Sequence, residues 1–236
     1  MRVGEELKPM SDEVYLSIIQ EQEPDFSEQF CEGVSIDDLD NEAIEILKDK
    51  YAKKQKNPSF RSLENYQALS DLGLIFQGKV TNAAVILVGK KDIINSKYPQ
   101  AKISLEYRTG ESNIHFDARE FFDGPYYIMI DKLWAAINSR NGSVPVRNGI
   151  YKDYDIPLFN EDVIREALNN AIAHRAYDIQ GEIVVKQYPT QMIFVNPGGF
   201  PHGVTIDNIL YVQSTPRNRL LADVLSKTGL VERSGQ

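Results

Sequence analysis

Cysteine is almost absent from the sequence, because Cys31 is the only one among 236 residues. A single thiol cannot close an intramolecular disulfide, which excludes a disulfide-rich secreted scaffold and favours a reducing compartment. We expect Cys31 to act as a small, partly buried apolar side chain. Long apolar runs are lacking too, and the run over 83–88 is far too short to cross a bilayer. Because the N-terminus carries no export signal, the sequence predicts a cytoplasmic protein with no membrane partner.

Basic residues are in the minority, with 26 Lys and Arg against 34 Asp and Glu and a net charge of −8. This balance argues against a nucleic-acid surface spread over the chain and leaves a local basic patch open. The hydrophobic content of 42% and the charged content of 25% are ordinary for a globular protein. The length suits one large or two modest domains. The abrupt start and end of the sequence suggest a piece of a longer protein.

Helix signals dominate the first hundred residues. The expected helix starts, each a capping residue followed by apolar positions at helical spacing, are Ser11, Asp40, Ser62 and Thr81. The polar stretch 53–59 ends the second helix, and Gly89 ends the fourth one, over 82–88. Between the third and fourth helices, 72–78 predicts a tight, hairpin-like turn. This order of elements is compatible with a small winged-helix-like unit.

Strands and helices are mixed in the second part of the chain. The expected elements are a strand over 101–107, its partner over 113–122, a helix from Pro125 through 137, a strand over 144–150 and a loop over 155–160. A helix follows over 161–177, then two strands over 182–187 and 192–196 joined by a hairpin turn, and a last helix that opens near Pro216. The sequence therefore predicts an α+β protein with helices over a mixed, largely antiparallel sheet.

The stretch EDVIREALNNAIAHRAY, residues 161–177, organises the rest of the chain. The apolar residues expected to face the core are Val163, Ile164, Ala167, Leu168, Ala171 and Ile172. Glu166, Asn170 and His174 are four residues apart, so each is offset by roughly 40° from the last, and they form a polar stripe along the margin of the apolar face. A carboxylate, an amide and an imidazole in one row suggest a functional site.

Ordinary structural roles compete with that interpretation. Polar residues on a helix margin are usually solvated or capping, and we expect Arg165 and Asn169 to face solvent. The stretch 196–203, NPGGFPHG, is too rich in glycine and proline for a regular element, and by itself it reads as a turn that ends a strand. His115 and His202 have no partners at metal-ligand spacing, which favours surface or structural roles.

Two neighbouring motifs carry a family resemblance. The stretch 165–175, REALNNAIAHR, followed by 194–201, FVNPGGFP, resembles the GHKL (Bergerat-fold) ATP-binding domains attached to Schlafen/AlbA-like transcriptional regulators, a group labelled as relatives of the RecG helicase. Further stretches that fit the same group are 71–84, 214–221 and 229–235. The resemblance implies a helical segment followed by a Bergerat-type α/β sandwich. Helicase activity is not expected, because no Gly-x-x-x-x-Gly-Lys-Ser/Thr loop exists to cradle phosphates.

The resemblance implies roles for the polar stripe. GHKL proteins carry Glu-x-x-x-Asn on this helix, and Glu166 and Asn170 match those positions. Asn170 would ligate Mg²⁺ beside phosphate oxygens and waters, and Glu166 would be the general base that orients an attacking water. His174, one turn further on, would donate a hydrogen bond to a phosphate. The implied cofactors are ATP and Mg²⁺, and the implied activity is at most a weak ATPase.

The glycine stretch would bind adenine in the same family. Its usual Asp-x-Gly-x-Gly pattern becomes Asn196-Pro-Gly198-Gly199 here, and an Asn offers one acceptor and one donor group where an Asp offers two acceptors. The family's next glycine motif, which closes the phosphate lid, is cut short at 233–236. The residues interpreted as a capped helix start with a solvated arginine are Ser214, Thr215 and Arg217.

Three functions follow as hypotheses. The first is an ATP-binding module of a multidomain regulator, in which a domain absent from this chain binds DNA. Whether such a module forms a homo-oligomer is left open by the sequence. The second is a degenerate scaffold that mediates protein association without nucleotide. The third is a hydrolytic metalloenzyme with Glu166, Asn170 and His174 as ligands, although it lacks the adjacent His-Glu pair of zinc peptidases.

The resemblance also suggests a division of the chain. We expect a helical linker region over 1–60, a small helical, winged-helix-like unit over 61–100, and a GHKL-like ATP-binding domain over 101–236 whose lid is truncated at the C-terminus. The polar break at 53–59 supports the first of these boundaries.

Overall fold

The computed structural model describes residues 2–3, 6–7, 24–110, 115–148, 151–200, 204–208, 211 and 216–230. Its first elements are the short antiparallel strands β1 (Arg2–Val3) and β2 (Glu6–Leu7). The helix expected to start at Ser11 lies outside the described residues. Among the residues that are described, no helix is long and apolar enough to cross a membrane.

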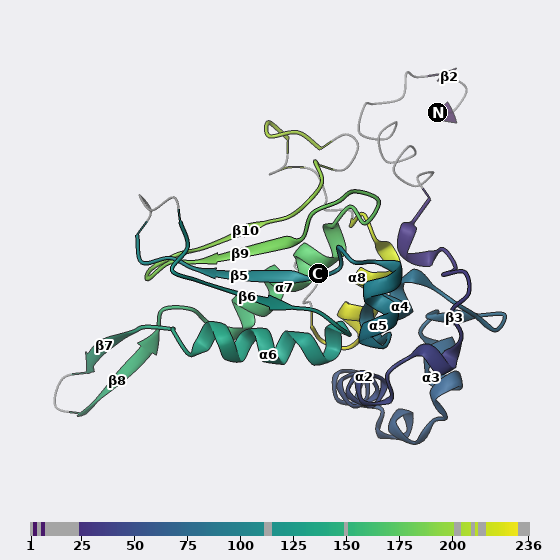
Figure 1. The fold of residues 1–236 in the computed structure, drawn as a ribbon, viewed down its shortest axis with the longest axis horizontal. Helices are drawn as coiled ribbons and strands as arrows, with labels where there is room; N and C mark the ends of the chain where they lie inside the picture. Colours follow the sequence, from purple (N-terminus) through teal and green to yellow (C-terminus); the bar gives the residue numbers. More distant parts are fainter. Residues whose placement is uncertain are drawn as a thin grey trace.

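Short helices build the N-terminal part of the described chain (Figure 1). They are η1 (Phe26–Glu28), η2 (Ile36–Asp38), α2 (Asn41–Lys54), η3 (Pro58–Ser62), α3 (Asn65–Asp71), α4 (Asn82–Val88) and α5 (Lys91–Lys97), and the hairpin of β3 (Ile75–Phe76) and β4 (Lys79–Val80) lies between α3 and α4. Two expected starts are confirmed: the Asp40 carboxylate accepts a hydrogen bond from Ala43 N at 3.0 Å, and the Thr81 hydroxyl accepts one from Ala84 N at 3.3 Å.

Other expectations for this part were wrong. Ser62 does not cap a helix, because Pro58 begins a 3-10 turn that includes Ser62, and α3 starts later, after Glu64. Helix α5 was not expected, since Ile93 and Ile94 are its only apolar residues and two adjacent positions give no helical periodicity. The hairpin turn was expected, and Gln77 and Gly78 take the positive φ values, 51° and 76°, that a tight two-residue turn requires.

Helix α4 joins the N-terminal helices to the rest of the chain. All of its residues are buried, and it packs against α2, α6, α8 and η1. Apart from Asn82 in its first position, α4 is apolar on every side, and such a helix has to lie inside a core. The buried apolar side chains form one continuous cluster that runs from Cys31 to Leu230, and Cys31 itself is only 7% exposed, as expected. The division of the chain near residues 60 and 100 stays a prediction.

A four-stranded sheet forms the centre of the C-terminal part, in the order β10-β9-β5-β6. The strands are β5 (Ile103–Tyr107), β6 (Ala118–Phe122), β9 (Ile183–Gln187) and β10 (Met192–Val195). Only β5 and β9 are parallel, and the other neighbours are antiparallel, which confirms the mixed, largely antiparallel sheet. Leu105 and Val185 are register partners at the centre of the parallel pair, and both are buried.

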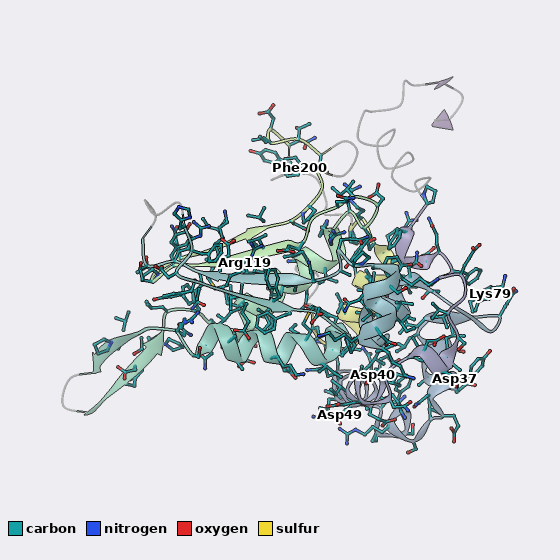
Figure 2. All side chains as sticks on the ribbon, in the orientation of Figure 1. Asp37, Asp40, Asp49, Lys79, Arg119 and Phe200 are labelled. Carbon is teal, nitrogen blue, oxygen red and sulfur yellow. The ribbon has the colours of Figure 1, made fainter. Side chains whose placement is uncertain are left out.

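Helices cover one face of this sheet (Figure 1). They are α6 (Tyr126–Asn138) and α7 (Glu161–His174), which contact β6 and β10 respectively, and α8 (Arg219–Lys227) packs on α7. On the opposite face Arg119 forms ion pairs with Glu182 at 2.5 Å and with Glu106 at 3.9 Å (Figure 2). One face of the sheet therefore carries the apolar core and the other carries charge.

A separate hairpin connects α6 to α7. It consists of β7 (Ser143–Asn148) and β8 (Tyr151–Pro157), which pair antiparallel. The strand expected over 144–150 is confirmed for 144–148, and 149–150 lie outside the described residues. The loop expected over 155–160 was wrong for 155–157. Cross-strand pairing of Val146 with Tyr154 and of Val144 with Ile156 holds that segment extended.

Candidate functional site

Helix α7 begins where the sequence predicts. The Asn160 side chain caps it by accepting hydrogen bonds from Asp162 N at 2.8 Å and Val163 N at 3.3 Å. Acidic residues in the first turn face the positive end of the helix dipole. Arg165 then forms an ion pair with Glu161 at 2.7 Å. Local capping and charge thus fix the start of the helix that carries the polar stripe.

The polar stripe lies on the open side of α7. Asn170 is exposed, and Glu166 and His174 are partly exposed. Val163 lies on the same side and is 62% exposed, so its expected place on the core face was wrong. Helices α6 and α8 and strand β10 cover the remaining sides. No hydrogen bond among the described residues engages the side chain of Glu166 or Asn170, so both are available to a ligand.

Asn169 and Arg165 do not face solvent, contrary to expectation. Asn169 is fully buried, its Oδ1 accepts a hydrogen bond from the Tyr126 hydroxyl at 2.6 Å, and its Nδ2 donates to the Leu230 carbonyl. The Arg165 side chain is 18% exposed and forms an ion pair with Asp131 at 2.8 Å. Polarity alone predicts an outward side chain, but a buried amide is tolerated when both of its ends are hydrogen-bonded. The buried part of the α7 surface is therefore wider than its apolar residues alone predict.

His174 ends the stripe in an environment that favours the neutral imidazole. Burial lowers its pKa below the ordinary value of 6.5, and the nearby positive charge of Arg217 lowers that pKa further. Its place in the last turn of α7 would favour the charged form, but burial outweighs that effect. A neutral imidazole has one donor and one acceptor nitrogen, so His174 can still donate a hydrogen bond to a ligand at neutral pH.

The lowered pKa of His174 makes stability depend on pH. Below pH 6.5 the unfolded chain binds a proton that the folded chain does not, so the free energy of unfolding falls as pH drops from 6.5 through the folded pKa, and this contribution is constant above 6.5. Between pH 7.5 and 5.5 the loss from His174 is at most about 1.4 kcal/mol. In urea unfolding at the two pH values, His174→Gln should lose less stability than the wild type. Equal losses would contradict the lowered pKa.

The glycine turn, defined as residues 196–199, contacts the C-terminal half of α7 directly. Asn196 Nδ2 donates a hydrogen bond to the Ala171 carbonyl at 2.8 Å. One turn further, Ala176 N donates to the Pro197 carbonyl at 3.1 Å. The helix and the turn thus lie against each other with no strand between them. Asn196 Oδ1 is buried and has no hydrogen-bond partner among the described residues.

The two glycines of the turn differ in their surroundings. Gly198 has a φ of +116°, and a Cβ there would lie 3.0 Å from the Cβ of Ala176, just after the end of α7, so both the backbone conformation and this contact disfavour a side chain. A Cβ at Gly199 would meet nothing within 4 Å, which leaves open space at that position. Gly198 is therefore needed for packing, whereas Gly199 borders free space. The exposed Phe200 follows on a loop that projects from the body (Figure 2).

The residues before α8 tie that helix to the glycine turn. Arg217 was expected to be solvated, but it is partly buried, and its guanidinium donates to the Gly199 carbonyl at 3.2 Å. Ser214 and Thr215 lie outside the described residues, as does His202. Sequence reasoning missed Asn218, which is fully buried and donates from Nδ2 to the carbonyls of Ala173 at 3.0 Å and Arg175 at 2.8 Å. Asparagine is a common capping residue, and that is the only signal the sequence offered.

An N-terminal segment caps α8, which the sequence also did not reveal. The Asp25 carboxylate accepts a hydrogen bond from Leu220 N at 2.9 Å, and the Ser27 hydroxyl accepts one from Leu221 N at 3.3 Å. Next to this cap the rings of Phe26 and Tyr177 are stacked, with centroids 5.4 Å apart. Residues almost 200 positions apart thus satisfy the amide groups at the start of one helix.

Oxygen groups on α7 fit magnesium better than zinc. The described residues contain no group of three or more His, Cys, Asp or Glu side chains that could hold a metal ion. The exposed Asn170 and the partly exposed Glu166 offer oxygen atoms, and Mg²⁺ is usually held by one or two such protein ligands together with waters and phosphates. The zinc-hydrolase hypothesis thus has no described ligand cluster, and it would need an unusual Asn ligand.

Comparison with protein families gives two partial matches. A family with the description "Putative ATP-dependent DNA helicase recG C-terminal" matches residues 180–236. This match includes β9, β10, the glycine turn and α8, but it begins after α7, so the polar stripe lies outside it. A domain of unknown function, DUF8451, matches residues 16–104. No curated protein sequence matches the chain significantly.

A solved structure shares the fold. The crystal structure of the DIP2311 protein from Corynebacterium diphtheriae has a TM-score of 0.74 and 22% sequence identity to this chain. The similarity covers 98% of this chain and 45% of that protein, so the chain spans less than half the length of its structural neighbour. The α+β class is thereby confirmed. The C-terminal quarter of the chain is thus similar to the RecG C-terminal family, and nearly all of the chain has the fold of the DIP2311 protein.

Proposed function

We propose that this chain is an ATP-binding regulatory module in which the glycine turn holds adenine and α7 holds Mg²⁺ and the phosphates. One observation carries the proposal, namely the buried Asn196 Oδ1 that has no partner among the described residues. The Ala171 carbonyl can only accept a hydrogen bond, so it fixes Asn196 Nδ2 as the donor toward the helix and leaves Oδ1 as a free acceptor. An unsatisfied buried acceptor costs about 1–3 kcal/mol, and the amino group of adenine is a donor that would satisfy it.

The family match supports the same location. Residues 180–236 match a family whose description names ATP dependence, and they contain the whole glycine turn. The GHKL resemblance adds the Glu166/Asn170 pair on the adjacent helix. Asn196 donates a hydrogen bond to the carbonyl of the residue that follows Asn170, which supports a site in which adenine and Mg²⁺ would bind next to each other along α7. The open space at Gly199 would leave room for a nucleotide beside the turn.

Each polar residue has a role in this proposal. Asn170 would supply one oxygen ligand to Mg²⁺, with phosphates and waters completing the shell. Glu166 would orient a water for slow hydrolysis, and a helicase activity is not part of the proposal. The neutral His174 would donate a hydrogen bond to a phosphate oxygen. Nucleotide binding would order the loop after Gly199 and so change the contacts of neighbouring domains.

The regulatory part of the proposal concerns the longer protein. The structural neighbour is more than twice as long as the region it shares with this chain. We place transcription regulation and DNA binding in a domain outside this chain, in line with its net charge of −8. The proposed division into 1–60, 61–100 and 101–236 makes the last part the nucleotide domain. The competing function is a scaffold of the same fold that binds no nucleotide, which the replacement of the family's Asp by Asn196 favours.

Adenine recognition through Asn196 predicts a preference for ATP over ITP. Inosine carries a carbonyl oxygen where adenosine carries an amino group, so ITP would place an acceptor against the Asn196 acceptor. Mg-ATP should therefore bind at least about tenfold more tightly than Mg-ITP. Titration calorimetry with both nucleotides measures the ratio, and Asn196→Leu should abolish the preference. Equal binding would contradict the adenine contact, and saturable binding of neither nucleotide at millimolar concentration would favour the scaffold.

A further inference from the structure

The β7–β8 hairpin projects from the body as an arm, defined as residues 143–157 (Figure 1). Within the described residues, the extensive contacts of each strand are with the other strand alone. The base of the arm is nevertheless fixed, because Asn141 Oδ1 accepts a hydrogen bond from Phe159 N at 3.0 Å and Asn141 Nδ2 donates to the Phe159 carbonyl at 2.8 Å. An isolated two-stranded ribbon is marginally stable in water unless it packs on something. The arm is thus held in a defined direction, and the other described residues give it no extensive cover.

One face of the arm is apolar. Val144 lies opposite Ile156 and Val146 lies opposite Tyr154, and directly paired residues project from the same face of a ribbon. We call these residues, Val144, Val146, Tyr154 and Ile156, the arm stripe. Val144 is 48% exposed, Tyr154 51% and Ile156 47%, and Val146 is partly exposed. Asp155 is paired with Pro145 and projects from the other face. A contiguous exposed patch of this kind marks an interaction surface.

The edges of the arm are protected, in contrast to its face. Pro145 and Pro157 have no backbone N–H to offer another strand, and the register shift between Val146 and Asn148 distorts the ribbon. Prolines and bulges are how natural sheets prevent edge-to-edge addition. A partner therefore meets the arm through the arm stripe and not by extending the sheet.

Charge points to the identity of the partner. Residues 143–157 contain two basic and two acidic residues, Arg147, Lys152, Asp153 and Asp155, so the arm is neutral while the chain as a whole carries −8. Two copies that met through other surfaces would bring acidic bodies together, whereas two arms meet without net repulsion. A strongly charged partner would instead be matched by an arm of opposite charge.

We infer that the arm stripe packs against the same stripe of a second copy of this chain. A two-fold axis allows one self-complementary patch to cover itself, which is the commonest arrangement of soluble homo-oligomers. The arm leads directly from α6 to α7. The contact would therefore fix the distance and orientation of the two α7 helices relative to each other. This inference does not depend on nucleotide binding.

Sedimentation velocity of the purified protein tests the inference. The wild type should be a dimer at tens of micromolar, and Ile156→Glu should raise the dimer dissociation constant at least about tenfold, because it places a charge in the centre of the contact. Asp155→Asn, whose side chain projects from the other face, should leave the dimer unchanged. Thermal unfolding monitors folding, and the isolated position of the arm predicts that Ile156→Glu keeps the folded body intact. A monomeric wild type, or a dimer that Ile156→Glu does not weaken, would overturn the inference.

Cross-linking gives a second, independent test. Because Cys31 is buried, a cysteine introduced on the arm is the accessible thiol. Under mild oxidation Val146→Cys should form a covalent dimer, since a stripe that packs on its own copy brings the two sulfur atoms near the axis. Asp155→Cys should remain largely monomeric on a denaturing gel. Equal cross-linking of the two variants would show a random encounter and would count against the proposed contact.

Discussion

Replacing Asn169 by alanine should lower the free energy of unfolding by about 3 kcal/mol, because the change removes two buried hydrogen bonds and leaves the Tyr126 hydroxyl and the Leu230 carbonyl without partners. For a chain of this size that loss corresponds to a fall in Tm of roughly 10 °C. Differential scanning calorimetry measures it. Asn169 is fully buried, so solvent cannot replace either partner.

A double-mutant cycle isolates the contact between α6 and α7. Tyr126→Phe removes only the hydroxyl donor, and its effect should be largely contained in that of Asn169→Ala, so that the double variant is less destabilised than the sum of the single ones. Strict additivity would mean that the two side chains do not act through their hydrogen bond. A Tm within 2 °C of the wild type for Asn169→Ala would contradict the buried position, given the roughly 10 °C expected.

The adjacent residue should behave in the opposite way. Asn170→Ala is expected to leave the Tm unchanged, because the side chain is exposed, but to weaken Mg-ATP binding about 100-fold. Loss of a residue that merely supports a metal ligand already costs about 10–100-fold in affinity, and loss of a ligand should cost no less. Calorimetric titration in the presence of Mg²⁺ gives the affinity, and the same titration with EDTA should show no difference between variant and wild type.

The controls follow from ligand chemistry. Asn170→Asp retains an oxygen ligand and should keep Mg-dependent binding, whereas Asn170→Leu should lose it. If Asn170→Ala binds Mg-ATP as the wild type does, the residue is not a magnesium ligand, even if the glycine turn binds adenine. The neighbouring asparagines thus separate two effects that are easily confused, loss of the fold and loss of the ligand.

Local signals in the sequence were sufficient for most of the fold. The caps at Asp40 and Thr81 and the strand predicted over 182–187 are decided by a few neighbouring residues, and the structure confirms them. Contacts between distant residues could not be predicted in this way. Asn169 has the polarity of a surface residue, and its burial is made favourable by two distant partners, Tyr126 at 43 positions and Leu230 at 61 positions along the chain.

The candidate site likewise combines features that neighbouring residues determine with contacts between distant residues. The four-residue spacing of Glu166, Asn170 and His174 placed them correctly on one side of the helix, because helical geometry is local. Their roles stay predictions. The contact of Asn196 with Ala171 depends on how β10 meets α7, and no spacing rule contains that information. Arg217 was misjudged for the same reason, since its partner is a backbone carbonyl of the glycine turn.

The cap on α8 has a practical consequence for anyone who dissects this protein. Asp25 and Ser27 satisfy amides that lie 195 and 194 residues away, and Phe26 covers the ring of Tyr177. A recombinant fragment that starts at β5 would contain the sheet, α7 and the glycine turn, yet it would expose the first amides of α8 and one face of that ring to water. Residues 24–28 therefore belong in any fragment meant to retain the proposed nucleotide-binding part, even though their sequence lies outside the part that matches the RecG C-terminal family.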